Sequence, residues 1–183
     1  MASADIELEI EEHEAEAKSA ALGNERRTII SIDGGATRSR GVVFTSDGAI
    51  LKYREIAGTS LSRPAGDSPQ RLGTFLQELA TAVDMSLADI QSINVGVAGV
   101  TNLDARERLF KELDRLHLGE RAMVTSDVEA AYEVCWGDRP GVVVCVGTGA
   151  ICWARDSDGQ THRASGRGPA AGGDPGSGYW LGR

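Results

Sequence analysis

The sequence is poor in the features that mark metal-binding, membrane-spanning and secreted proteins. It has three cysteines in 183 residues and no Cys-x-x-Cys pair, which argues against a zinc or iron–sulfur site and favours reduced thiols. No apolar run approaches the roughly 20 residues that a membrane-spanning helix needs. The first residues do not follow the basic and then apolar pattern of a secretory signal. We therefore expect a cytoplasmic protein that does not enter a membrane.

Positive charge is also scarce. The formal net charge is −8, and residues 1–27 alone hold eight acidic and three basic residues. The rest of the chain is nearly balanced, with nineteen acidic and sixteen basic residues. Without a basic face, nucleic-acid binding is not expected. Residues 1–27 are predicted to form an acidic, solvated extension, with an added edge strand or a partner-docking element as the alternative.

The sequence contains no GxxxxGK[ST] motif, which excludes a P-loop. Glycine, by contrast, is abundant towards the end of the sequence. Eleven of the 23 glycines lie in the last 43 residues, from Gly141 onwards. Such a density is typical of loops that approach a ligand closely, or of a hinge.

The spacing of apolar and turn residues predicts an α/β chain. Meander strands come first and alternating helices and strands follow, which favours a mixed sheet covered by helices. Ser68 is the expected N-cap of the first helix. The expected elements, in order, are strands 28–33, 39–46 and 49–56, helix 68–84, a turn at 86–89, strand 93–98, helix 104–116, strand 122–125 and helix 127–136. A final hairpin is expected within Gly141–Gln160.

Two stretches, Ile29–Leu51 and Gly141–Gln160, share one pattern. Each has an apolar strand, a tight glycine turn, a second strand and a Ser-Asp-Gly turn. Bare glycines let backbone N–H groups approach an anion, so two such turns could grip one polyphosphate. Asp127 lies between them, where an apolar strand is expected to enter a helix. We expect the two turns to converge on a shared anion, flanked by Asp33 and Asp127, and this layout indicates phosphoryl transfer.

Four segments in this order, IDGGATRS, VTSDVEAAY, VVVCVGTGAI and GRGPAAGGDPGSGYWLGR, resemble the BadF/BadG/BcrA/BcrD-type ATPases. Within that family the likeness is greatest to the N-acetylglucosamine kinases, which belong to the actin-like, Hsp70-like and sugar-kinase superfamily. The resemblance covers residues 28–183. It implies an actin-like (ribonuclease H-like) α/β domain over 28–164, with an antiparallel meander, a mixed sheet and flanking helices.

The resemblance also implies that residues 165–183 form a linker and the first helix of a second domain whose remainder is missing. That helix would expose Tyr179, Trp180 and Leu181, and exposed apolar surface favours association. A homodimer, or a second chain that supplies the other half, is therefore an expected partner.

The resemblance to the family implies a role for each residue of the first turn. Asp33 would face Mg²⁺ through water, while Gly34, Gly35 and Thr37 would donate to the phosphates of ATP. Ala36 stands where the family usually has a third glycine. The alternative is a plain hairpin turn with Asp33 at its mouth.

The second turn matches the family's Gly-Thr-Gly motif. Gly147, Thr148 and Gly149 would form the other phosphate grip, with a tight turn between core strands as the alternative. Ala150 stands where the kinases often carry a serine that contacts the sugar.

Asp127 matches the family's catalytic acid, which would accept the proton of the sugar hydroxyl during attack on the γ-phosphate. An N-cap aspartate is the alternative. Gly166 and Gly168 resemble a Gly-Trp-Gly segment, with Arg167 in place of tryptophan. Asp174 matches an acid that binds sugar hydroxyls in the kinases.

The sequence also departs from the family pattern in two places near the expected sugar site. Pro175 follows Asp174 where the family commonly has Glu, and structural loops remain the alternative for this region. Gly58-Thr59-Ser60 lies where the kinases often place a sugar-binding Asn, and no role is assigned to Ser60.

The expected function is ATP-dependent, Mg²⁺-dependent phosphorylation of an amino sugar similar to N-acetylglucosamine, or the N-terminal domain of such a kinase. The small-molecule sugar is the expected substrate. Two alternatives stay open: an ATPase activator of a radical dehydratase or reductase, and a non-catalytic scaffold or ligand sensor with the same fold. The three cysteines do not resemble the cluster ligands that such an activator would need.

Overall fold

The computed structural model describes residues 26–62, 67–168 and 174–182, and the chain divides after Thr125 into two compact units. The predicted extension, except for Arg26 and Arg27, lies outside the described residues. The division falls inside the range 28–164 that was expected to form one domain, and those domain boundaries stay a prediction. Within the described ranges, no helix combines the length and the apolar character that crossing a membrane requires.

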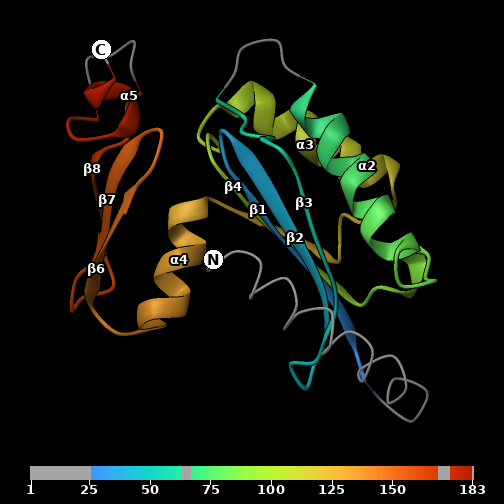
Figure 1. Ribbon diagram of the computed structural model, residues 1–183. Helices are drawn as coiled ribbons and strands as arrows, with labels where there is room; N and C mark the ends of the chain where they lie inside the picture. Colours follow the sequence, from blue (N-terminus) through green and yellow to red (C-terminus); the bar gives the residue numbers. More distant parts are fainter. Residues whose placement is uncertain (1–25, 63–66, 169–173, 183) are drawn as a thin grey trace, which may run out of the picture. The chain divides into compact units, whose positions relative to one another are not determined.

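The first unit contains a five-stranded mixed sheet with the order β3-β2-β1-β4-β5 (Figure 1). The antiparallel meander comes first, and β4 then runs parallel to β1 and β5 parallel to β4. The predicted meander and mixed sheet are confirmed, with strand ends displaced by about one residue. The strands are β1 (Thr28–Gly34), β2 (Arg38–Thr45), β3 (Ile50–Ala57), β4 (Ser92–Val97) and β5 (Ala122–Thr125).

Two helices, α2 (Ser68–Thr81) and α3 (Leu103–Arg115), cover one face of this sheet (Figure 1). Their apolar residues recur at helical spacing, so each helix buries one face. The contact is close at Gly41 of β2, where an added Cβ would lie 2.5 Å from Leu79 Cδ1. A core forms between α2, α3 and the sheet. Its fully buried members include Ile30, Val43, Leu72, Leu76, Leu79, Ile93, Leu109 and Leu113.

The start of α2 differs from the prediction. Asp67 is the N-cap residue and Ser68 is the first helical residue, so Ser68 is not the cap. The Ser68 hydroxyl instead donates to the carbonyl oxygen of Ser60 at 3.0 Å. The Ser68 hydroxyl is therefore used in a tertiary hydrogen bond and does not cap α2. The predicted turn at 86–89 is confirmed as the 3₁₀ helix η1 (Leu87–Asp89).

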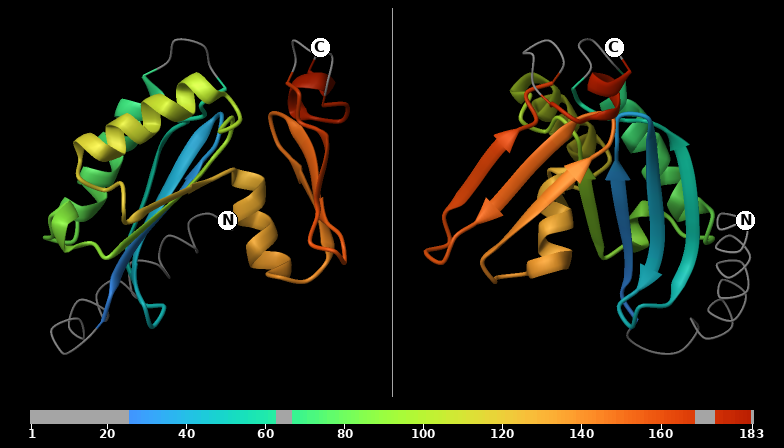
Figure 2. Two further views of the ribbon diagram at one scale, coloured as in Figure 1. Left: turned by 180° about the vertical axis from the view of Figure 1, so that it is seen from behind. Right: turned by 60° about the vertical axis from the view of Figure 1, so that its left-hand side comes forward.

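The second unit is a three-stranded antiparallel sheet with helix α4 (Asp127–Trp136) on one face. Tyr132 of α4 packs edge-on against Trp153, with ring centroids 4.5 Å apart. Figure 2 shows the three strands and the short helix α5 (Gly178–Leu181) at one end of this sheet. The strands are β6 (Gly141–Val146), β7 (Ala150–Arg155) and β8 (Thr161–Ser165). Strand β8 was not predicted.

Candidate active site

The carboxyl ends of β1, β4 and β5 share one edge of the first sheet, because these strands run parallel. Ligands of open α/β sheets bind beyond such strand ends. Asp33 lies at this edge, and its side chain is exposed on the face opposite α2 and α3, since Ile30 and Ile32 occupy the buried face. The predicted metal-facing carboxylate is thus open to solvent. No group of three His, Cys, Asp or Glu residues suited to a metal occurs in the described part of the chain.

A row of charges crosses the meander beside Asp33. Arg40 of β2 pairs with Asp33 in register, and Glu55 of β3 pairs with Arg40. Arg40 Nε donates to Glu55 Oε2 at 3.2 Å. This hydrogen bond is the main reason that the pKa of Arg40 lies above its ordinary value, and the Asp33 charge adds a smaller effect. Sequence reasoning missed Arg40, because its register opposite Asp33 depends on the strand pairing.

The first glycine turn is oriented by hydrogen bonds to its carbonyl groups. Ala98 N donates to Gly34 O at 2.9 Å, and Ser60 N donates to Gly35 O at 3.1 Å. In a trans peptide the N–H points opposite to the C=O, and no peptide bond among the described residues is cis. The N–H groups of Gly35 and Ala36 therefore point away from the segments that hold these carbonyls. Backbone N–H groups at the tip of a tight glycine turn are a favourable anion site.

Residues 57–61, which we call the strap, hold this turn from behind. Gly58 N donates to Thr37 O at 3.0 Å, in addition to the Ser60 hydrogen bond. A Cβ added at Gly58 would lie 2.5 Å from the carbonyl carbon of Ala36 and 2.8 Å from Gly35 O. The backbones are thus in direct contact, and only glycine fits at position 58 without displacing the turn. Sequence reasoning singled out residues 58–60 but did not find this role, because it arises from long-range contacts.

The second glycine turn, between β6 and β7, is held in the same manner by α5. Gly178 N donates to Gly147 O at 2.8 Å, and Tyr179 N donates to Thr148 O at 3.2 Å. By the same peptide geometry, the N–H groups of Thr148 and Gly149 point away from α5. The second unit therefore also presents two successive N–H groups on one side of a tight turn.

Asp174 lies against this second turn. A Cβ added at Gly149 would lie 2.8 Å from Asp174 Oδ2, and Ser165 Oγ donates to Asp174 Oδ1 at 3.4 Å. Asp174 is buried and has a φ of 66°, in the left-handed region that non-glycine residues rarely adopt. Such a conformation persists only where the surroundings enforce it, and it is common at functional sites. Ser177 N donates to Asp174 O at 3.1 Å and links this residue to the start of α5.

Asp127 is the first residue of α4, two residues after the end of β5. The N-cap alternative for Asp127 is wrong, because Ser126 is the cap. Ser126 Oγ accepts from Glu129 N at 3.1 Å, and Glu129 Oε2 accepts from Ser126 N at 2.9 Å, which completes a capping box. Asp127 Oδ1 accepts from Val128 N at 3.0 Å. Asp127 is thus not the N-cap residue, although its carboxylate accepts from an N–H of the first turn of α4.

The two remaining predicted glycines follow β8. Gly166 N donates to Ala150 O at 2.8 Å, which places Gly166 next to the second turn. Gly166 and Gly168 both have positive φ values, 68° and 79°. An added Cβ at Gly166 would lie 2.9 Å from Ile151, whereas nothing lies within 4 Å of one at Gly168. At position 166, therefore, both the positive φ and the nearby Ile151 side chain disfavour any residue larger than glycine. At position 168 only the positive φ does so.

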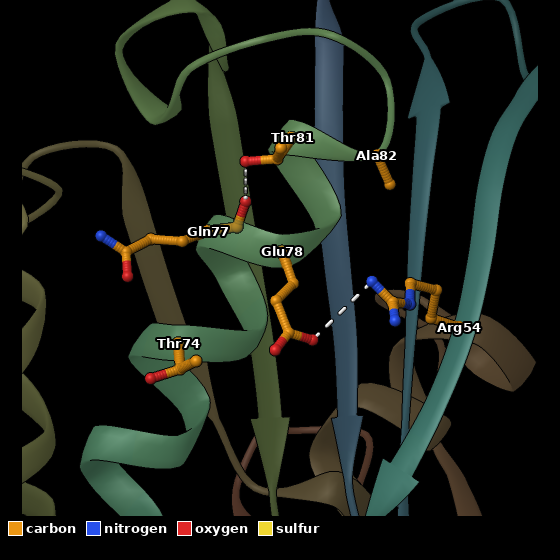
Figure 3. Close-up of a pocket in the computed structure, with 6 residues that line it drawn as sticks. All are labelled: Arg54, Thr74, Gln77, Glu78, Thr81 and Ala82. Carbon is orange, nitrogen blue, oxygen red and sulfur yellow. Dashed lines mark hydrogen bonds and ion pairs between the residues drawn. The ribbon is translucent and has the colours of Figure 1, made fainter.

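A shallow hollow on the first unit lies apart from these residues. Figure 3 shows it beside the C-terminal half of α2, with Arg54 Nη1 and Glu78 Oε2 3.8 Å apart. None of the predicted site residues line it, and it is not a candidate nucleotide site. The lining residues are Arg54, Thr74, Gln77, Glu78, Thr81 and Ala82.

The structure groups nine of the eleven predicted site residues into two local sites, and Asp127, at the start of α4, and Gly168 belong to neither. Asp33, Gly34, Gly35 and Thr37 lie together at the end of β1 and the turn that follows. Gly147, Thr148, Gly149, Gly166 and Asp174 lie together at the β6–β7 turn. That the two turns converge on one anion stays a prediction.

Comparison with known proteins supplies the family context. Residues 30–183 match the model of the BadF/BadG/BcrA/BcrD ATPase family. The N-acetylmuramic acid/N-acetylglucosamine kinase of Clostridium acetobutylicum is 27% identical over 155 residues, which are 84% of this chain and 50% of that protein.

Two solved structures are also similar. A protein of Chromobacterium violaceum assigned as an N-acetylglucosamine kinase gives a TM-score of 0.70 at 28% identity, covering 85% of this chain and 54% of that one. Its counterpart from Porphyromonas gingivalis gives 0.65 at 26% identity, covering 85% and 53%. These likenesses confirm the predicted actin-like α/β fold. The chain spans about half the length of these relatives.

Proposed function

Because the chain belongs to the BadF/BadG/BcrA/BcrD ATPase family, we propose that it carries phosphate- and sugar-binding parts of an ATP-dependent amino-sugar kinase. N-acetylglucosamine is the sugar we favour, since the similar proteins are named for it. One observation carries the proposal most directly. In each unit, a glycine turn has two successive carbonyl groups held from behind, so that the next two N–H groups point the other way.

Phosphoryl transfer needs positioning and neutralisation of phosphate charge more than covalent participation by the protein. Backbone N–H groups at the tips of the two glycine turns would bind phosphate oxygens of ATP. Backbone N–H groups suit this task because they are rigidly held and donate to oxygen without a side chain.

Asp33 fits the role of a magnesium ligand. Its carboxylate is exposed at the strand end. Mg²⁺ commonly binds through one or two carboxylates, retained waters and phosphate oxygens, so a single carboxylate at this position suffices. When bound, Mg²⁺ would neutralise the charge on the transferring phosphoryl group.

Asp127 would act as the general base. A sugar hydroxyl oxygen attacks the γ-phosphorus, the bond from that phosphorus to the β–γ bridging oxygen breaks, and ADP leaves. The hydroxyl proton passes to the Asp127 carboxylate. Asp174, which already accepts from Ser165, would accept hydrogen bonds from sugar hydroxyls and orient the attacking oxygen.

The test uses the natural protein that carries this sequence, with Mg·ATP and N-acetylglucosamine, and measures sugar-dependent ADP formation. Asp127→Asn is expected to lower kcat by about 100-fold or more, the usual range for loss of a general base, while the sugar Kd stays within about twofold. Asp104→Asn is the matched control. It makes the same change in the first turn of α3 and should leave kcat unchanged.

Two results would contradict the proposal. Unchanged kcat in Asp127→Asn would remove the base assignment. ATP hydrolysis by the wild-type protein that no amino sugar stimulates would remove the kinase assignment and favour an ATPase of another kind.

A further inference from the structure

A buried pair of hydroxyl groups lies behind the first glycine turn. Ser39 of β2 and Thr59 of the strap are both fully buried, and their side-chain oxygens are 2.7 Å apart. Ser39 Oγ also accepts from Thr59 N at 2.9 Å. One side chain on the sheet thus fixes both the main chain and the side chain of a single strap residue. The roles proposed above do not use either hydroxyl.

Thr59 lies between the two strap residues whose N–H groups hydrogen-bond to the turn. Its neighbours Gly58 and Ser60 supply the two N–H groups with which the strap holds the turn. Its own Oγ1 would lie 3.2 Å from a Cβ added at Gly34, so the hydroxyl lies close behind the turn. Displacement of Thr59 would therefore move both hydrogen-bond donors of the strap together.

We propose that Ser39 and Thr59 are positioning residues that hold the first glycine turn in its anion-binding orientation through the strap. The inference rests on the proposed function and specifies how one half of its phosphate site is kept in place. Loss of the Thr59 hydroxyl leaves Ser39 Oγ with only the main-chain N–H of residue 59, and loss of the Ser39 hydroxyl removes both bonds to Thr59, so either change favours a shift of the strap. A misplacement of about 1 Å is enough to weaken a positioned contact strongly.

The experiment compares Thr59→Val, which replaces the hydroxyl by a methyl of similar size, with Thr59→Ser, which retains it. Thr59→Val is expected to raise both the KM for ATP and the calorimetric Kd for Mg·ATP by about tenfold, or 1.4 kcal/mol. The KM for the sugar should change by less than about twofold. Thr59→Ser should restore ATP binding to within about threefold of wild type. Ser39→Ala should reproduce the Thr59→Val phenotype.

Thr45→Val is the matched control. Thr45 is also buried, lies on the same strand as Ser39, and donates from Oγ1 to Asp47 and to Ala49 O, the latter at 3.3 Å. It lies six positions from Ser39, which places it about 20 Å away along β2. Thr45→Val should lower the melting temperature without changing the KM for ATP.

The outcomes separate the two proposals. Weaker ATP binding in Thr59→Val with rescue by Thr59→Ser supports the positioning role, even if no sugar is phosphorylated. Equal losses of melting temperature in Thr59→Val and Thr45→Val, with ATP binding unchanged in both, would overturn it. Wild-type protein that binds ATP but phosphorylates no amino sugar would instead remove only the kinase assignment.

Discussion

Gly58→Ala tests whether the strap and the turn are in backbone contact. The added methyl would meet the carbonyl carbon of Ala36 at 2.5 Å and Gly35 O at 2.8 Å. Real Cβ atoms essentially never lie this close to other atoms, and neither neighbour is a flexible side chain. The two backbones must therefore separate, which breaks or lengthens the strap's hydrogen bonds to Gly35 O and Thr37 O.

The cost follows from these contacts. Two hydrogen bonds contribute about 1 kcal/mol each, and overpacking adds about 1–3 kcal/mol. The alanine restricts the unfolded chain, which offsets about 0.4–1 kcal/mol. A net loss of about 3 kcal/mol remains, and for a chain of this size it corresponds to a fall in melting temperature of roughly 6–12 °C. Affinity for Mg·ATP should fall as well, because the turn loses its support.

Thermal unfolding followed by circular dichroism, and calorimetric binding of Mg·ATP, check both effects. Gly48→Ala is the control, since an added Cβ there meets nothing within 4 Å and only the positive φ of 91° opposes it. Its expected cost is about 1–2 kcal/mol, without loss of ATP binding. The reasoning is refuted if Gly58→Ala melts no lower than Gly48→Ala.

Two further predictions concern the second unit. Gly149→Ala should displace the buried Asp174 carboxylate, from which the new methyl would be 2.8 Å away, and so raise the KM for the sugar by about tenfold, or 1.4 kcal/mol. Gly147→Ala, with nothing within 4 Å, should raise it less, and equal effects would refute the placement of Asp174. Ser126→Ala should lower the melting temperature by about 2–4 °C, because loss of an N-cap costs about 1 kcal/mol. An unchanged melting temperature would show that the capping box does not stabilise α4.

Elements with strong local patterns could be predicted from the sequence. The apolar spacing of α2 and the short apolar strands around Ile30 and Val95 were located to within a few residues, because burial on one face requires that spacing. Strand β8 could not be predicted. Its sequence, Thr-His-Arg-Ala-Ser, is mostly exposed, and it is a strand because β7 pairs with it at the edge of the sheet.

The candidate site shows the same limit. Glycine turns and the helix-start position of Asp127 are visible in the sequence, but the roles of their neighbours are not. The Ser126–Glu129 capping box has a readable Ser-x-x-Glu spacing, yet it was missed in favour of Asp127 itself. The hold of the strap on the first turn has no local pattern, because its hydrogen bonds join residues more than 20 positions apart.

Phosphate binding through main-chain amides affects which sequence positions can change during evolution. The phosphate contacts proposed for the two turns come from the peptide backbone, so side chains there can vary more freely than those of a side-chain site. Gly58, packed against the rear of the first turn, has no comparable latitude, since any larger residue displaces what it supports. Around the first turn, evolutionary constraint should therefore extend to residues behind the ligand that never touch it.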